Sequence, residues 1–335
     1  MSTWSGVGTR LTPLWPKLMV PAKSSSAEHF VAAMLPSKPA RRPWLHGLSA
    51  QAQGVLAINI AAVIFGTAAL YGKLNVSPFW IVAMRAGFGA LTLGLLGGYR
   101  IDLRGLASLW GGLGLSGFFL AVHWLTFFVS VQQAGVAVAT LTFATFPLFT
   151  VLVEAIEQRR LPRPTEFAVG VVIIIAVALL VEPSGNGQRN LEGAAAGLVS
   201  AFTYALFWRA GRQLGTALSP TSISFYQNFG VLLLLAPTLL FAVPAPQSVV
   251  QWLSLAALGV FNTAVMLLIY LYALERLSAS TCSGFIALEP VYAIVFAALF
   301  FQEPITPWIV VSIVLILGAS ITLLRLEKQP SPSVI

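Results

Sequence analysis

Charged residues are scarce in this chain. Asp, Glu, Lys and Arg together make up 9% of the sequence, and hydrophobic residues make up 57%. Soluble domains carry about a quarter charged residues, so this composition excludes an ordinary soluble globular protein. Long apolar runs recur from residue 54 onward, and the mean hydropathy is +0.85. We therefore expect a polytopic membrane protein embedded in a lipid bilayer.

Groups that carry catalysis or bind metal are also few. The single cysteine, Cys282, excludes an intrachain disulfide and a multi-cysteine metal site, and its simplest role is a small buried residue. The three histidines (His29, His46 and His123) lie far apart, and no H-E-x-x-H or G-x-S-x-G motif occurs. No G-x-x-x-x-G-K-[ST] loop occurs either, so ATP does not drive the protein directly. We expect no catalytic residues, no metal and no cofactor.

The first fifty residues differ from the rest of the chain. They carry six basic residues against one acid, Glu28, with scattered prolines and serines. No apolar core follows the basic start, which excludes a secretory signal peptide. We expect residues 1–50 to be a disordered basic cytoplasmic tail, and 326–335 to be a second tail. A transit segment, or a true start at Met34, stays open as an alternative.

Ten apolar segments follow, each near the roughly 20 residues that a helix needs to cross a bilayer. They cover 54–72, 79–98, 107–131, 134–156, 165–182, 193–210, 223–243, 250–273, 279–301 and 305–325. Short connections between them predict a compact helical bundle.

The basic residues predict the orientation of this bundle. With the N-terminus inside, sixteen lysines and arginines fall on the cytoplasmic side, and only Lys73 and Arg189 fall opposite. This bias predicts that both termini are cytoplasmic, in what we expect to be a bacterial inner membrane. The net charge of +8 is then a matter of topology, and we expect no nucleic-acid partner.

The chain contains one kind of helix twice. Val136–Arg160 and Ala279–Glu303 lie 143 positions apart, and Pro147 aligns with Pro290. We expect these two prolines to act as hinges, because proline removes a backbone donor and frees a carbonyl one turn back.

Shorter matches extend the repeat. Phe65 in the first segment matches Tyr204 in the sixth, and Arg85 in the second matches Gln227 in the seventh. Two five-helix repeats, 54–182 and 193–325, follow from these matches. Because each repeat crosses the membrane an odd number of times, the second copy inserts upside down. Inverted repeats of this kind are common in secondary transporters.

Several features together resemble a known family. They are Phe65-Gly66, the spacing from Pro78 to Arg85, the proline-bearing fourth and ninth helices, and Gln302-Glu303-Pro304-Ile305. The chain resembles the EamA-type exporters of the drug/metabolite transporter superfamily over residues 54–325. The resemblance implies export of amino acids or related metabolites, with proton coupling as a further expectation.

The sequence departs from the family pattern at two places. The fourth helix ends Glu157-Gln-Arg-Arg-Leu161, where the family usually has Gly-Glu-Arg-Leu, and Gln227 stands opposite Arg85 in the repeat. These departures leave the fold prediction intact, but they give no support to a named substrate.

Ionisable side chains inside apolar helices are rare and costly, so they are candidates for function. At 1.5 Å per residue, Arg85 and His123 lie about 10 and 12 Å below the outer face, and Glu289 lies near the midplane. Burial favours the protonated form of Glu289, which could then exchange a proton as access alternates. Its alternative role is structural, paired with Arg85 or hydrogen-bonded to another helix.

Arg85 suits a carboxylate or phosphate, because its guanidinium can bind either one bidentately. The alternatives are a permanent ion pair or a side chain that reaches outward to the membrane surface. His123 is a second coupling candidate, although a lone membrane histidine is more often a packing residue. Aromatic and amide residues complete the expected cavity: Trp80, Phe143, Tyr204, Gln227, Asn262, Tyr270 and Tyr292.

The leading hypothesis is a secondary transporter of small amphipathic metabolites, working by alternating access as a monomer or homodimer. A receptor or assembly protein without transport, a channel and an intramembrane enzyme are the alternatives. Small-xxx-small patterns at Gly94–Gly98 and Gly193–Gly197 allow close helix approach, either within one chain or between two.

Overall fold

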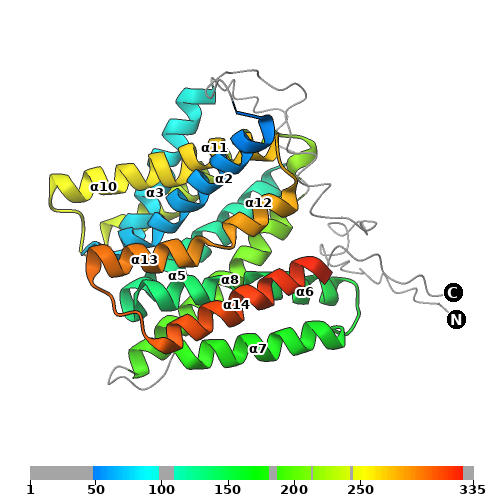
Figure 1. Cartoon of the computed structure of the whole chain (residues 1–335). Coiled ribbons are helices and arrows are strands. Elements are labelled where there is room, and N and C mark those ends of the chain that lie inside the picture. The colour runs from blue at the N-terminus through cyan, green and yellow to red at the C-terminus, as the bar shows by residue number, and fades with distance from the viewer. Residues whose placement is uncertain (1–47, 98–108, 181–186, 213, 242–243, 327–335) are drawn as a thin grey trace, which may run out of the picture.

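The computed structural model describes residues 48–97, 109–180, 187–212, 214–241 and 244–326, so most of the two predicted tails lies outside it. Within these ranges every regular element is a helix (Figure 1), which confirms the all-helical prediction. The α-helices are α2 (Ala50–Thr67), α3 (Pro78–Gly97), α5 (Trp110–Phe143), α6 (Phe146–Glu157), α7 (Pro164–Leu180), α8 (Gly187–Gly211), α9 (Pro220–Leu235), α10 (Val249–Gly259), α11 (Met266–Leu274), α12 (Ala279–Ile286), α13 (Glu289–Phe301) and α14 (Pro307–Leu326). The 3-10 helices are η2 (Ala68–Lys73), η3 (Leu214–Thr216) and η4 (Ala236–Leu240), and η5 (Val260–Val265) is a π-helix.

Seven helical stretches of the described chain are long and apolar enough to cross a membrane, and two shorter apolar helices accompany them. One of the seven, α5, is interrupted by Gly135, whose φ of 87° and ψ of 173° are not helical. The interruption coincides with the predicted boundary between segments 107–131 and 134–156. The predicted count of ten crossings stays a prediction.

Serine and proline fix where several helices begin. The hydroxyls of Ser49, Ser219, Ser248 and Ser278 accept hydrogen bonds from backbone N–H groups in the first turns of α2, α9, α10 and α12. These N-caps satisfy donors that have no partner within the helix. Proline is the first residue of α3, α7, α9 and α14, where its missing N–H costs nothing.

The two predicted hinge prolines lie at equivalent breaks. Pro147 occupies the first turn of α6, just after α5 ends, and Pro290 occupies the first turn of α13, just after α12 ends. At the first break Leu148 donates to the Thr145 carbonyl, three residues back, and the Ser320 hydroxyl donates to the Ala144 carbonyl at 3.1 Å. A side chain from α14 thus satisfies backbone exposed by the break.

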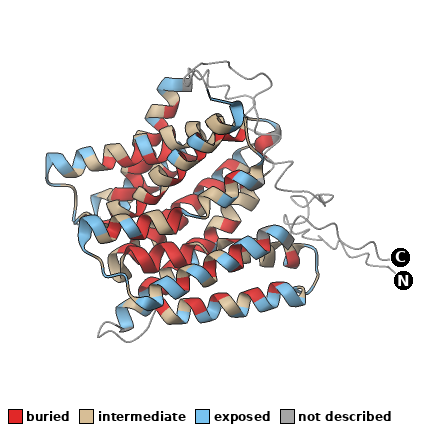
Figure 2. Cartoon of the chain, in the orientation of Figure 1, coloured by how far each residue is buried: buried red, intermediate tan, exposed pale blue. Residues whose placement is uncertain are grey.

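The two halves of the chain interlock. Helix α2 packs on α11, α5 packs on α8, α3 packs on α9 and α7 packs on α14, so each pair joins one helix from each half. Buried residues concentrate where the central helices meet, whereas α7 and α14 expose one face (Figure 2). Large apolar side chains are exposed on such faces, including Ile174 at 68%. An apolar outer surface suits contact with lipid.

Two ion pairs mark the two ends of the bundle. Lys73 pairs with Glu303 just beyond α2 and α13, and Arg209 of α8 pairs with Glu157 of α6. Helix α8 begins near Glu303 and runs to Arg209, sixteen residues beyond Gly193, a distance of about 24 Å. We refer to these as the Glu303 end and the Arg209 end.

Glycines on α8 allow it to approach α5 closely inside the chain. A Cβ added to Gly193 would overlap Ala134, and one added to Gly197 would overlap Thr142 and lie 3.1 Å from the Ser130 hydroxyl. This small-residue pattern therefore serves packing within one molecule. Gly94 lies near Phe225 of α9, and Gly98 lies outside the described residues.

Replacing Gly197 with valine should lower the melting temperature of the purified protein in detergent. The added side chain collides with Thr142, and overpacking of this kind costs about 1–3 kcal/mol. Gly114→Ala in α5 is the matched control, because nothing lies within 4 Å of a Cβ there. Equal melting temperatures for the two variants would contradict the packing assigned to α8.

Candidate functional site

Arg85 of α3 is a buried cation at the centre of the bundle, with 5% of its surface exposed. Its Nε donates a hydrogen bond of 3.1 Å to the Thr263 hydroxyl, and its guanidinium carbon lies 4.1 Å from the centre of the Trp124 ring. A cation over an indole face is stabilised by the ring quadrupole. Two helices other than its own therefore hold the side chain in place.

Close backbone approach brings Thr263 to Arg85. A Cβ on Gly259 would lie 2.7 Å from the Arg85 carbonyl oxygen and 2.9 Å from the Gly89 nitrogen, so α10 and α3 touch backbone to backbone. The π-helix η5 begins at the next residue and carries Thr263. Single π-helical turns inside longer helices are frequent at functional sites.

Most hydrogen-bonding capacity of Arg85 remains available. No residue that the structure describes forms a hydrogen bond or ion pair with its two terminal nitrogens, which carry four N–H groups. Glu289 lies within electrostatic range of Arg85, but the two do not form an ion pair. One alternative that the sequence left open was a permanent ion pair between Arg85 and Glu289. The described residues show no such pair.

Glu289 is the first residue of α13 and is 7% exposed. Among the described residues, no hydrogen bond or ion pair reaches its carboxylate. Gly66 of α2 packs against this turn, since a Cβ there would lie 3.2 Å from the Glu289 carbonyl and 2.8 Å from the Tyr292 Cβ. The site thus contains a buried carboxylate and a buried guanidinium that do not neutralise each other by contact.

Three rings, two from α5 on either side of the Gly135 break and one from α8, form the apolar wall of the site. The His123 ring centre lies 4.7 Å from that of Tyr204 and 4.9 Å from that of Phe143, and Phe143 and Tyr204 are 5.1 Å apart. Phe146 stacks on Phe143 at 5.6 Å. Tyr204 is also within electrostatic range of both Arg85 and Glu289. The predicted residues Arg85, Glu289, His123, Phe143 and Tyr204 therefore gather in one region.

Comparison with known proteins agrees with this arrangement. The EamA-like transporter family model matches residues 52–182 and again residues 191–325. The chain belongs to the EamA-like transporter family. The family resemblance seen in the sequence is thereby confirmed, and the chain is an integral membrane protein of a transporter family.

Relatives of this EamA-like transporter give no substrate. An uncharacterized transporter YxxF of Bacillus subtilis is 26% identical over 285 residues, covering 82% of this chain and 91% of that protein. An uncharacterized transporter of Clostridium kluyveri is 27% identical over 300 residues, covering 80% and 92%. One crystal structure superposes with a TM-score of 0.57 at 20% identity, over 85% of this chain and all of that one. This last likeness concerns the fold alone.

His123 of this EamA-like transporter is held by α8. Its Nδ1 lies 2.8 Å from the Ser200 hydroxyl and 3.1 Å from the Ser200 carbonyl oxygen. A protonated Nδ1 donates to the carbonyl oxygen or to the hydroxyl, whereas an unprotonated Nδ1 accepts from the hydroxyl, so the roles depend on the tautomer. These contacts give His123 a packing role in addition to the coupling role that the sequence suggests.

Other predicted residues lie outside the central group. Trp80 packs edge-on against Trp252 at 5.7 Å, and the Gln227 amide donates to the Ser116 hydroxyl at 3.0 Å. Tyr270 packs in a separate cluster that contains Cys282, which is buried as expected.

Asn262 joins η5 to α2. Its amide donates to the Ile64 carbonyl and, at 2.8 Å, to the Thr67 hydroxyl, just before α2 changes into the 3-10 helix η2. Its neighbour Thr263, which contacts Arg85, was not among the residues predicted from the sequence. Trp124, the neighbour of His123, was not among them either. Both residues could have been found by their position, because each directly follows a predicted polar residue in the sequence.

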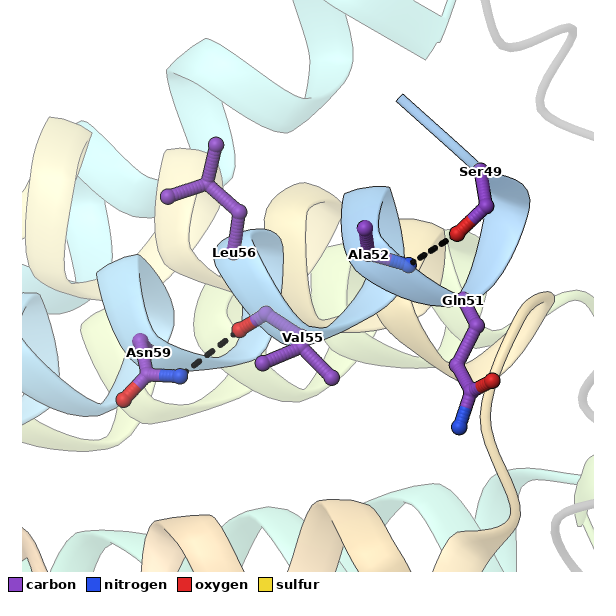
Figure 3. Close-up of a pocket in the computed structure, with 6 residues that line it drawn as sticks. All are labelled: Ser49, Gln51, Ala52, Val55, Leu56 and Asn59. Atoms are coloured by element: carbon purple, nitrogen blue, oxygen red, sulfur yellow. Dashed lines mark hydrogen bonds between the residues drawn. The ribbon is translucent and has the colours of Figure 1, made fainter.

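The described residues contain no cluster of three or more His, Cys, Asp or Glu that could hold a metal ion. An open hollow of about 500 Å³ lies over the first turns of α2 (Figure 3). Its lining consists of Ser49, Gln51, Ala52, Val55, Leu56 and Asn59. It lies at the Arg209 end, and none of the predicted site residues lines it.

Thr263→Val should destabilise the protein, because it leaves the Arg85 Nε–H buried without an acceptor. Hydrogen bonds to charged groups contribute about 1.5–3 kcal/mol. Thermal unfolding in detergent measures the effect, and Thr263→Ser, which keeps the hydroxyl, is the matched control. If the serine and valine variants melted together, the hydroxyl contact would have no energetic role.

Proposed function

We propose that this protein is a secondary active transporter that exports small zwitterionic or amphipathic metabolites, such as amino acids, by alternating access. The observation that carries the proposal is the pair of buried ionisable groups, one basic and one acidic, Arg85 and Glu289, which form no ion pair with each other. Burying charges is costly unless partners compensate them. A solute with one charge of each sign supplies both partners.

Each group suits one part of such a solute. The terminal nitrogens of Arg85 match a carboxylate bidentately. Glu289 is positioned to accept hydrogen bonds from an ammonium group. Phe143, Tyr204 and His123 form an aromatic wall for an apolar side chain, and Tyr292 lies one turn beyond Glu289. Trp80, Gln227, Asn262 and Tyr270 are then supports for the helices around the cavity.

The proposed architecture is ten crossings in two inverted five-helix repeats, with both termini in the cytoplasm of a bacterial cell. Reciprocal packing supports it, because the first helix, α2, meets α11 while its repeat partner, α8, meets α5. Helices α3 and α9, which the repeat relates, pack on each other, as do α7 and α14. An in-plane two-fold axis produces this set of pairs.

Coupling to protons is proposed to pass through Glu289. A carboxylate at this position gains a proton when the site is dry and loses it on contact with water or an ammonium group. His123 is the second candidate, and its contacts with Ser200 limit its freedom to move. Pro147 and Pro290 are proposed as the hinges on which the fourth and ninth helices bend.

Arg85→Gln should weaken substrate binding in reconstituted liposomes. Losing one partner of a buried charge interaction costs about 2–5 kcal/mol, so the half-saturating concentration should rise at least about thirtyfold. Arg85→Lys keeps the charge but not the bidentate geometry and should give an intermediate value. Saturable uptake of labelled amino acids and small amines measures both. Normal affinity in Arg85→Gln would remove Arg85 from the site.

Glu289→Gln should abolish the acceleration of flux by a pH gradient, because glutamine exchanges no proton. The measurement compares uptake with and without the gradient for native protein, Glu289→Gln and Glu192→Gln. Glu192 is an exposed glutamate at the start of α8, so its variant should behave as native protein. Gradient-dependent flux in Glu289→Gln would make Glu289 structural. Absence of flux for every solute in folded native protein would favour a receptor or assembly role.

A further inference from the structure

The interruption of α5 at Gly135 lies at the Glu303 end, and hydrogen bonds hold it there. The Val136 N–H, one residue past the break at Gly135, donates to the Glu303 carboxylate at 3.0 and 3.3 Å. Glu303 also forms the ion pair with Lys73. A Cβ on Gly135 would lie 3.1 Å from Glu303 Oε1, and its φ of 87° also favours glycine. We name Lys73, Val136 and Glu303 the latch.

Two further contacts join the same elements. The Gln132 amide donates to the Val76 carbonyl at 2.9 Å. Gly72 lies so close to Val131 that a Cβ there would be 2.8 Å from the Val131 Cβ. Helix α13 also packs directly on α5. At this end, then, the group formed by α2, η2, α11, α12 and α13 is closed against the group formed by α5, α6 and α8.

The repeat supplies an internal comparison for these contacts. The match of Phe65 with Tyr204 also aligns two pairs of glycines, Gly54 with Gly193 and Gly72 with Gly211. The match of Pro147 with Pro290 aligns Ala134 with Leu277 and Val131 with Leu274. For each contact between two of these residues, the repeat therefore names the two residues that would form the equivalent contact.

Contacts within each group obey the repeat. Gly193 packs on Ala134, and Gly54 packs on Leu277, where a Cβ would lie 2.8 Å from the Leu277 Cγ. These equivalent contacts lie at opposite ends of the bundle. Each group is thus built in the same way, and its internal packing is compatible with movement as a unit.

Contacts between the groups do not obey the repeat. Gly72 meets Val131, but around Gly211 the one atom within 4 Å of an added Cβ belongs to Gln227, and Leu274 is farther away. Among the described helices, α12 packs on α2 and α11 while α6 packs on α8, α14 and α7, with no comparable packing between α6 and α12. Figure 1 shows α12 and α6 diverging toward the Arg209 end. The two groups touch at the Glu303 end and separate at the Arg209 end.

We propose that this arrangement is one access state of the transport cycle, open at the Arg209 end, and that Glu303 is the latch residue that closes the opposite end. The inference rests on the proposed transporter function. The hollow over the first turns of α2 lies at this same Arg209 end (Figure 3). In the other access state the repeat requires Gly211 to close on Leu274 and the latch to open.

The latch has no equivalent at the Arg209 end. In the repeat Glu303 aligns with Arg160, and the nearby Glu157, at the end of α6, pairs with Arg209 of α8, inside its own group. Helix α12 is capped by its own Ser278 and receives no carboxylate from α6. The Lys73–Glu303 and Arg209–Glu157 ion pairs thus each lie within one group, and it is the hydrogen bond from Val136 to the Glu303 carboxylate that crosses between the groups. Among the described residues this contact exists at one end only, and it biases the protein toward the state seen here.

Two double-cysteine variants in a Cys282→Ala background test the latch in proteoliposomes. Val76→Cys with Gln132→Cys reports closure at the Glu303 end, and Gly211→Cys with Leu274→Cys reports closure at the Arg209 end. A short bifunctional thiol reagent should cross-link the first pair readily and the second pair poorly. Adding Glu303→Ala should raise cross-linking of the second pair about tenfold, the shift that loss of about 1.4 kcal/mol produces.

Glu157→Ala is the matched control. It removes a terminal ion pair that, like Lys73–Glu303, lies within one group, but Glu157 accepts no hydrogen bond from a described residue of the other group, so the cross-linking ratio should stay unchanged. Glu303→Gln, which keeps an acceptor for Val136 but loses the charge, should give an intermediate ratio and guards against misfolding of the alanine variant. Equal cross-linking of both pairs in native protein, or a ratio indifferent to Glu303→Ala, would overturn the proposal.

The cross-linking measurement needs no substrate, so it separates the two proposals. Asymmetric cross-linking without flux for any solute would refute transport and leave the latch standing. Flux that persists after the Val76–Gln132 pair is cross-linked would refute the latch as part of the cycle and leave transport standing.

Discussion

Enclosing a guanidinium among apolar helices is the constraint on which the centre of this protein depends. Arg85 is tolerable there because Thr263 satisfies its Nε–H and Trp124 lies under its charge. Thr263 reaches Arg85 only because α10 and α3 touch at Gly259 and Gly89. The charge in α3 thereby determines that a small residue, Gly259, is needed at the end of α10. The same charge keeps most of its donors unused among the described residues.

Much of the architecture was predictable from the sequence, because the bilayer makes helix formation obligatory and apolar run length measurable. The breaks at Pro147 and Pro290, and the boundary at Gly135, fell where the pattern placed them. The relation between the halves was visible as repeated residues. What the repeat could not reveal is which contacts between the halves are made, since a repeated sequence is compatible with either access state.

The site was only partly predictable. Ionisable residues in apolar runs pointed to Arg85, Glu289 and His123, because their cost singles them out. Aromatic residues carry no such signal: Trp80 packs edge-on against Trp252, and Tyr270 packs in the cluster of Cys282. Thr263 was overlooked because a hydroxyl in a membrane helix usually bonds its own backbone. Its role depends on the π-helix, which could not be predicted from the local sequence.

That π-helix has a consequence for the orientation of the residues that follow it in the same helix. In η5 the adjacent residues Asn262 and Thr263 serve different neighbours, α2 and α3 respectively. If the same residues instead formed an α-helix, with no change in their number, everything that follows would rotate by about 100°. Tyr272, whose hydroxyl donates to the Gln53 side chain at 2.9 Å, would then face away from α2. The wide turn of this helix is therefore as much a part of the site as its side chains, because it sets which residues after it face α2.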